Sequence, residues 1–160
     1  KKDFAFTIGP MCGVNRVTSE PPSHIHCAEW SAKACPFLTQ RLIHRRPVDD
    51  IEGGVVVDPA GIHFDQNPGV ACIWVCRDYS LFNAPGGAGF LIDIGEPSEV
   101  RWYRKGGPAT RAEVIAAIDA GYPRLQELAK PQGPGAIGEL RRRRQLLETW
   151  LPEENGPEQI

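Results

Sequence analysis

The sequence predicts an α+β protein with a mostly antiparallel sheet of four to five strands, one N-terminal helix and two to three C-terminal helices. Two observations support this prediction. Short runs rich in β-branched and aromatic residues dominate the first two thirds of the chain, and segments with helical periodicity dominate the last third. Strands that are followed by helices indicate α+β, because a parallel α/β fold would alternate the two.

Five segments are predicted to be strands, and glycine or proline bounds most of them. They cover residues 4–8, 55–57, 70–76, 90–94 and 100–103. The last two are expected to form a hairpin that turns around Glu96, Pro97 and Ser98. The segments 9–22 and 80–89 are expected to be loops.

The helices have clear sequence limits. Residues 24–34 are predicted to form a helix, because Pro36 disfavours helical geometry at Cys35. Thr110 and Glu113 match a capping box, in which the Thr hydroxyl and the Glu carboxylate satisfy free amides at the helix start. That helix is expected to end at Gly121, and a further helical segment is expected at 124–129. Residues 136–151 have the periodicity of an amphipathic helix.

The length of the chain limits the number of domains, and its net charge limits the classes of partner. The 160 residues fit one domain, predicted over 1–152 and followed by a polar tail at 153–160. The 18 Lys and Arg against 20 Asp and Glu give a formal charge of -2, which argues against a surface that is basic throughout. No apolar run reaches the ~20 residues that span a bilayer, and no signal peptide is visible. We therefore expect a cytoplasmic protein with no membrane partner.

Cysteine and histidine cluster near the N-terminus. Three of the five cysteines and two of the four histidines fall within 24 residues. Zinc prefers thiolate and imidazole ligands in a tetrahedron. The predicted set is Cys12, His24, Cys27 and Cys35, which would form a structural zinc site. On a straight helix Cys27 and Cys35 would lie about 12 Å apart, so the set requires the helix to break before Cys35.

Three other interpretations of this cluster stay open. An iron–sulfur cluster also uses cysteine ligands. Alternatively the thiols are free and packed in the interior, where cysteine behaves as a small apolar residue. In a catalytic interpretation, Cys12 is a nucleophile that His24 or His26 activates, with Glu29 orienting the imidazole. Cys72 and Cys76 lie four apart in a predicted strand, point to the same side and are assigned to the core.

A run of four arginines, Arg141, Arg142, Arg143 and Arg144, lies in the last predicted helix. At least one of them must lie near the apolar side of the helix, because the run covers a full turn. Together with Arg41, Arg45 and Arg46 the run predicts a patch that contacts nucleic-acid phosphates. The alternative is a solvated helix face paired with Glu139 and Glu148.

Two stretches of the chain carry a resemblance. They are GPMCGVNRVTSEPPSH with the following CPFL, and IGEPSEVRWYRKGGPATRAEVIAAIDAGYP. They resemble a family of small uncharacterised proteins from bacterial and phage genomes. The resemblance implies an intracellular setting and no particular activity or residue role.

The function predicted from these features is that of an intracellular accessory protein with a structural zinc site near the N-terminus, acting on nucleic acid or on a protein partner. The first alternative is a metal- or thiol-dependent enzyme, hydrolase-like, that uses Cys12 with His24 or His26. The second is a metal-free interaction protein. A closed site of four ligands is structural, whereas three ligands and an open position are catalytic, so the ligand count distinguishes the first two.

Overall fold

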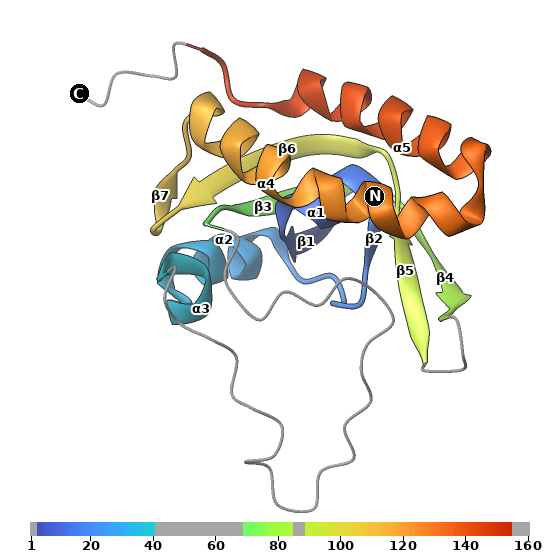
Figure 1. Ribbon diagram of the computed structural model, residues 1–160. Coiled ribbons are helices and arrows are strands. Elements are labelled where there is room, and N and C mark those ends of the chain that lie inside the picture. The colour runs from blue at the N-terminus through green and yellow to red at the C-terminus, as the bar shows by residue number, and fades with distance from the viewer. Residues whose placement is uncertain (1–2, 41–68, 85–88, 155–160) are drawn as a thin grey trace, which may run out of the picture.

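Two antiparallel sheets organise the fold. The structure is a computed structural model that describes residues 3–40, 69–84 and 89–154. The first sheet has the order β1-β3-β6-β7, formed by Phe4–Ile8, Ala71–Cys76, Pro97–Arg104 and Gly107–Pro108. The second has the order β2-β5-β4, formed by Val17–Thr18, Phe90–Ile94 and Tyr79–Asn83. The predicted α+β class is confirmed, with the strands divided between two sheets (Figure 1).

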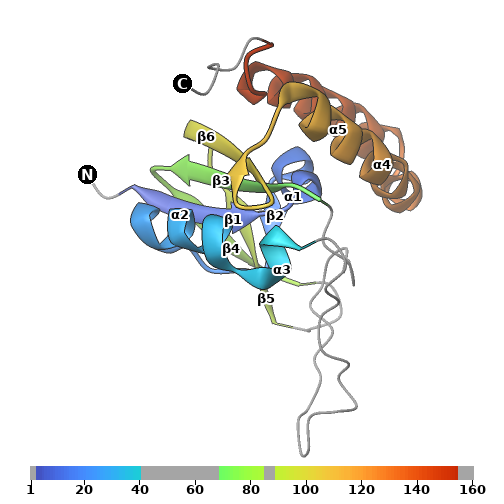
Figure 2. The same ribbon diagram turned by 90° about the vertical axis from the view of Figure 1, so that its left-hand side faces the viewer.

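Helices cover both faces of the first sheet (Figure 2). On one face lie α2 (Ile25–Ala34) and the short α3 (Pro36–Thr39). On the other lie α1 (Pro10–Asn15) and the two long helices α4 (Arg111–Ala129) and α5 (Pro134–Leu147). Short 3-10 turns at Lys130–Gln132 and Glu148–Trp150 follow α4 and α5. Within the described ranges, no helix has the length and apolar composition that crossing a membrane requires.

Strand β3 is the centre of the core, and all six of its residues are buried. Successive side chains of a strand point to opposite faces. Cys72, Trp74 and Cys76 therefore join the core beneath α1, α4 and α5, whereas Ile73 and Val75 pack towards α2. The prediction that Cys72 and Cys76 lie on one side and pack in the core is confirmed.

The predicted hairpin of residues 90–94 and 100–103 is wrong. Strand β5 pairs with β2 and β4, and β6 pairs with β3 and β7. The chain crosses from one sheet to the other at Gly95 and Glu96. Trp74 holds this crossing in place, because its Nε1 donates to the Gly95 carbonyl at 2.9 Å. The turn residues therefore mark a change in the direction of the chain, but the two strands that they connect do not pair with each other.

Three other local expectations fail. Residues 9–22 contain α1 and β2, and residues 79–83 form the edge strand β4. Helix α4 does not end at Gly121 but continues through Pro123. Gly121 is buried against Met11 of α1, where a Cβ would lie 2.8 Å from the Met11 side chain, so this contact favours a residue without a side chain. Tertiary packing thus overrides two residues that locally disfavour a helix.

The C-terminal helices match the prediction closely. The Thr110–Glu113 capping box is present. The amphipathic segment of 136–151 is divided between α5 and the turn that follows it, and Trp102 Nε1 anchors that turn by donating to the Trp150 carbonyl at 2.8 Å. The predicted strand 55–57 and tail residues 155–160 lie outside the described residues.

Candidate functional site

The four predicted zinc ligands lie on two sides of the first sheet. Cys12 belongs to α1, and its side chain packs against the core beneath α1, α4 and α5. His24 precedes α2, Cys27 lies on that helix, and Cys35 joins it to α3. Helix α2 packs against the opposite face of the sheet. The structure therefore does not bring Cys12 together with the other three.

Metal chemistry requires several ligands in one place. In the ranges 3–40, 69–84 and 89–154, no three side chains of His, Cys, Asp or Glu are placed to hold one metal ion. Side chains near the cluster have other partners. His26 Nδ1 lies 3.7 Å from Glu29 Oε2, and Glu29 also pairs with Arg101. Zinc and an iron–sulfur cluster stay predictions from the sequence, and the described geometry adds no support to them.

Cys12 does not have the environment of a catalytic nucleophile. Burial raises the pKa of its thiol from 9.0 to about 11, although the backbone of Gly9 and the hydroxyl of Thr18 act in the opposite direction. The thiolate is the reactive form of cysteine, so a raised pKa suppresses reactivity at neutral pH. His24 and His26 are exposed on the α2 side of the sheet. This arrangement gives no support to the thiol enzyme.

The predicted arginines of the last helix lie on α5. Arg141 and Arg142 are exposed, whereas Arg143 and Arg144 are partly buried. Arg144 pairs with Asp119 at 3.2 Å and so links α5 to α4. The remaining arginines of the predicted patch, Arg41, Arg45 and Arg46, lie outside the described residues. Arg143 contacts the carbonyl of Asn15 at the end of α1, whereas Arg142 pairs with Glu139 on α5 itself.

Arg16 approaches Arg142 and Arg143 from the end of α1. It is the residue directly after α1, its φ of 64° is left-handed, and its side chain is only 6% exposed. Its NH1 and NH2 each lie 3.2 Å from a carboxylate oxygen of Glu96, and its guanidinium carbon lies 4.7 Å from the centroid of the Trp74 ring. Within the described residues, Arg16 Nε has no hydrogen-bond partner. A buried cation in a strained backbone position is costly, so it calls for a specific explanation.

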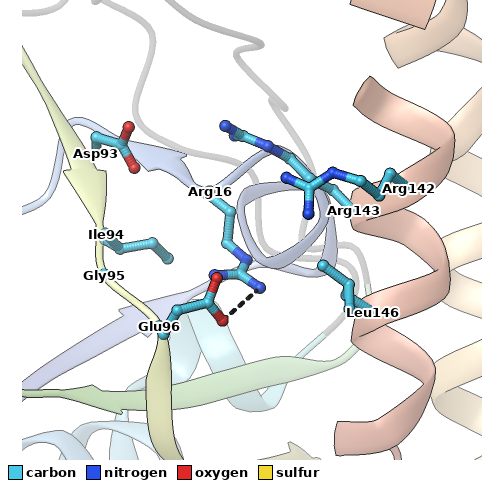
Figure 3. Close-up of a pocket in the computed structure, with 8 residues that line it drawn as sticks. All are labelled: Arg16, Asp93, Ile94, Gly95, Glu96, Arg142, Arg143 and Leu146. Atoms are coloured by element: carbon cyan, nitrogen blue, oxygen red, sulfur yellow. Dashed lines mark hydrogen bonds and ion pairs between the residues drawn. The ribbon is translucent and has the colours of Figure 1, made fainter. Parts of the chain in front are cut away.

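A cavity of about 170 Å³ lies where these arginines meet, and we call it the arginine pocket (Figure 3). Its walls come from the end of α1, the end of β5, the crossing between the sheets, and α5. Its lining residues are Arg16, Asp93, Ile94, Gly95, Glu96, Arg142, Arg143 and Leu146. The pocket thus has cationic groups from two distant parts of the chain, two carboxylates and an apolar side.

Backbone contacts fix the inner wall of the arginine pocket. The Ile94 N–H donates to the Arg16 carbonyl at 2.9 Å, so the end of α1 is tied to the end of β5. The Val17 N–H donates to the Asn15 side chain at 2.9 Å, which supports the turn at Arg16. A Cβ at Gly95 would overlap the side chain and the carbonyl of Asp78. The backbone that carries Arg16 is therefore bonded directly to the end of β5.

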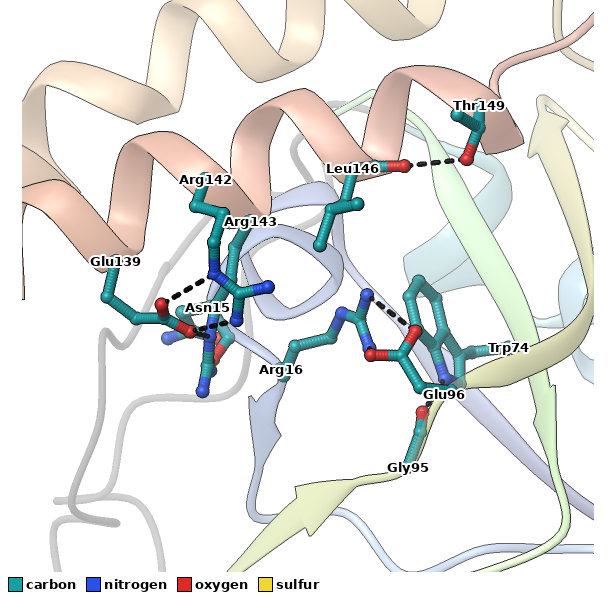
Figure 4. Close-up of polar contacts among 10 residues, drawn as sticks. All are labelled: Asn15, Arg16, Trp74, Gly95, Glu96, Glu139, Arg142, Arg143, Leu146 and Thr149. Atoms are coloured by element: carbon teal, nitrogen blue, oxygen red, sulfur yellow. Dashed lines mark hydrogen bonds and ion pairs between the residues drawn. The ribbon is translucent and has the colours of Figure 1, made fainter.

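The outer wall carries its own carboxylate (Figure 4). Glu139 accepts hydrogen bonds from Arg142 and Arg143, and these bonds lower its pKa from 4.5 to about 2. Arg143 also donates to the carbonyl of Asn15 at the end of α1. Glu139 thus orients both guanidinium groups, and Arg143 links α5 to the wall that carries Arg16.

Sequence reasoning found Arg142 and Arg143 as a run of charge, but it missed Arg16. A basic residue after a helix is favourable for local electrostatic reasons, so its type at this position is no sign of a site. The signal that identifies Arg16 is the combination of burial, a left-handed φ and an unpaired Nε, and none of these can be read from the sequence.

Relatives do not supply a role for the arginine pocket. Comparison of the chain with protein-family models, with curated proteins and with solved structures finds no significant match.

Proposed function

We propose that this chain is a cytoplasmic accessory protein that binds nucleic acid through the arginines of α5 and Arg16. The observation that carries the proposal is the convergence of Arg16, Arg142 and Arg143 on one pocket from parts of the chain far apart in sequence. Guanidinium groups suit phosphate, because their fixed fork of donors matches its oxygens. A cytoplasmic setting accords with the five cysteines, all of which are free.

The charge distribution supports a local interface. The formal charge of the chain is -2, so attraction to a polyanion must come from a patch and not from the surface as a whole. Arg141 and Arg142 are exposed on α5 beside the arginine pocket, and Glu139 is the acidic residue that pairs with Arg142. An exposed ion pair of this kind contributes about 0–1 kcal/mol, so a phosphate can replace the carboxylate at small cost.

Fluorescence anisotropy with labelled oligonucleotides tests the proposal. Single-stranded DNA, single-stranded RNA and duplex DNA are titrated with the protein at low salt and then at rising salt. We expect binding that weakens as salt rises, because each arginine that neutralises a phosphate releases counterions from the strand. Failure of all three nucleic acids to bind at low salt would contradict the proposed function.

A pair of variants locates the interface. Arg141→Gln with Arg142→Gln removes two exposed cations from α5. We expect the slope of log K against log salt for single strands to become shallower by about 0.7 for each phosphate that the variant no longer neutralises. Lys33→Gln removes one exposed cation from α2, on the other side of the sheet, and should leave the slope unchanged. Equal effects at the two places would show that the binding is not confined to α5.

A further inference from the structure

Arg16 is a buried cation whose anionic partner is exposed. A left-handed backbone is sterically unfavourable for a residue with a side chain. Burial removes the guanidinium from water, yet in the described residues its Nε has no acceptor. Its anionic partner, Glu96, has a side chain that is 80% exposed. The net gain from a pair with so exposed a carboxylate is small.

The side chain of Glu96 can move away from Arg16 without a change in the backbone. Its backbone is fixed on both sides, by the bond from Trp74 to Gly95 and by the start of β6 at Pro97. Its side chain, in contrast, lies mostly in water and contacts Arg16 only through the carboxylate. Rotation of this side chain into solvent would break no bond of the backbone. In Figure 3 the Glu96 carboxylate occupies the outer end of the Arg16 guanidinium, and its departure would open that end to another anion.

We propose that the arginine pocket binds the terminal phosphate of a nucleic-acid strand, which takes the place of the Glu96 carboxylate on Arg16. This inference rests on the proposed function and adds the chemical group that the pocket selects. Two phosphate oxygens can accept from NH1 and NH2 of Arg16, the groups that now contact the Glu96 carboxylate. A terminal phosphate has a third free oxygen, which can accept from Arg142 or Arg143 on the opposite wall.

Size and charge favour a strand end over an internal phosphate. About 170 Å³ holds a phosphate group but lies below the range of roughly 300–1,000 Å³ of pockets for larger ligands. An internal phosphate continues into sugar on both sides, whereas a terminal one enters with its chain on one side only. A terminal phosphate also carries close to two charges at neutral pH. The three guanidinium groups favour that dianion, whereas Asp93 in the same lining opposes any anion.

The experiment compares two single-stranded oligonucleotides of the same sequence, one with a 5′-phosphate and one with a 5′-hydroxyl, each labelled at the 3′ end. Anisotropy should show about tenfold tighter binding of the phosphorylated strand to the unmodified protein, as expected for one further pair of charged hydrogen bonds. Inorganic phosphate in the millimolar range should remove this preference, so that the two strands bind with the same affinity.

Two variants should move the preference in opposite directions. Arg16→Gly removes the guanidinium, suits the left-handed φ and should abolish the preference, so that the two strands bind with equal and weaker affinity through the remaining arginines of α5. Glu96→Gln removes the competing carboxylate and should enlarge the preference several-fold, which loss of a merely structural pair would not do. Lys33→Gln should leave the preference as it is. Circular dichroism confirms that each variant is folded.

The outcomes separate this inference from the proposed function. Equal binding of both strands to the unmodified protein, or a preference that survives Arg16→Gly, would overturn the inference and leave nucleic-acid binding intact. If inorganic phosphate stabilises the protein against heat while neither strand binds, the pocket belongs to the free anion and both proposals fail. A preference for the phosphorylated strand that disappears in Arg16→Gly and grows in Glu96→Gln would support the inference that the pocket binds a terminal phosphate.

Discussion

The guanidinium of Arg16 lies over the indole of Trp74, with 4.7 Å between the guanidinium carbon and the ring centroid. The same indole donates from Nε1 to the Gly95 carbonyl at 2.9 Å. One fully buried side chain of β3 therefore holds both the cation of the arginine pocket and the point at which the chain passes between the two sheets. Stability and the site are coupled through Trp74.

Trp74→Phe should lower the free energy of unfolding by about 1–3 kcal/mol, because it leaves the partly buried Gly95 carbonyl without its donor and reduces the packing under Arg16. Urea unfolding followed by circular dichroism measures the change. The matched control is Trp30→Phe on α2. Trp30 is 70% exposed, so this change should stay within about 0.5 kcal/mol. Equal losses in both variants would contradict the role of the indole N–H.

The backbone of Arg16 can be tested separately from its charge. Arg16→Ala and Arg16→Gly lose the same guanidinium, but only glycine adopts a φ of 64° without a steric penalty. We expect the glycine variant to be more stable than the alanine variant by about 1 kcal/mol. The same pair of changes at the exposed Arg141, inside α5, should give the opposite order, because glycine destabilises a helix interior by about 0.5–1 kcal/mol relative to alanine. Urea midpoints of the four variants provide the test.

Local signals in the sequence predicted what local forces decide. The capping box at Thr110 and Glu113 forms because its two hydrogen bonds lie within four residues. The predicted strand 70–76 forms as Ala71–Cys76, because its β-branched and aromatic side chains pack on both faces. Such segments are read from their own residues, and the fold class follows from their order.

Features that depend on distant contacts could not be read in this way. Residues 90–94 and 100–103 are separated by residues typical of a hairpin turn, yet the strands that form there pair with strands elsewhere in the chain. Gly121 and Pro123 look like a helix end, yet packing on α1 carries the helix through them. The arginine pocket joins Arg16 to residues more than a hundred positions later, so neither half of the sequence indicates it. The cysteine–histidine cluster shows the converse, since Cys12 is close to His24 in sequence but lies across a sheet from α2.

Loss of the helix cap should weaken the fold most clearly at neutral pH. The Thr110 N–H holds the pKa of Glu113 below its ordinary value of 4.5, with a smaller contribution from Arg104. A carboxylate whose pKa is lowered by folding stabilises the protein above 4.5, and this stabilisation is lost as the pH falls through the lowered pKa. Glu113→Gln should therefore reduce the stability at pH 7 and flatten its decline below about pH 4.5. Thermal unfolding between pH 2 and pH 7 measures both effects, and an unchanged acid limb would contradict the assignment.

The hydroxyl of the same cap gives an independent test. Thr110→Ala removes the acceptor for the Glu113 N–H, now at 3.3 Å, and should cost about 1 kcal/mol at neutral pH. Thr110→Ser keeps the acceptor and should cost little. Hydrogen exchange at the first turn of α4 should become faster in the alanine variant only. If serine and alanine are equally destabilising, the loss comes from the methyl group and not from the cap.

The cysteines should differ strongly in reactivity, and this difference also bears on the enzyme alternative. Cys27 is exposed, whereas burial raises the pKa of the Cys12 thiol to about 11 and raises the pKa values of Cys72 and Cys76 as well. Because the thiolate is the form that reacts, a short alkylation pulse at about pH 8 should label Cys27 first and leave these three largely unmodified. Peptide mapping by mass spectrometry identifies the labelled residues, and unfolding in guanidinium should make all five react.

Rapid labelling of Cys12 in the folded protein would reverse this conclusion. It would require a thiolate at neutral pH, and therefore a cation or a hydrogen-bond donor near Cys12 that outweighs its burial. His24 and His26 lie on the α2 side of the sheet, so His24→Ala and His26→Ala should leave the labelling rate of Cys12 unchanged. A slower rate in either variant would restore the pairing that the nucleophile alternative needs. If the labelling rate of Cys12 is slow and unchanged in both variants, Cys12 is a packing residue of α1 whose thiol contacts the core around β3.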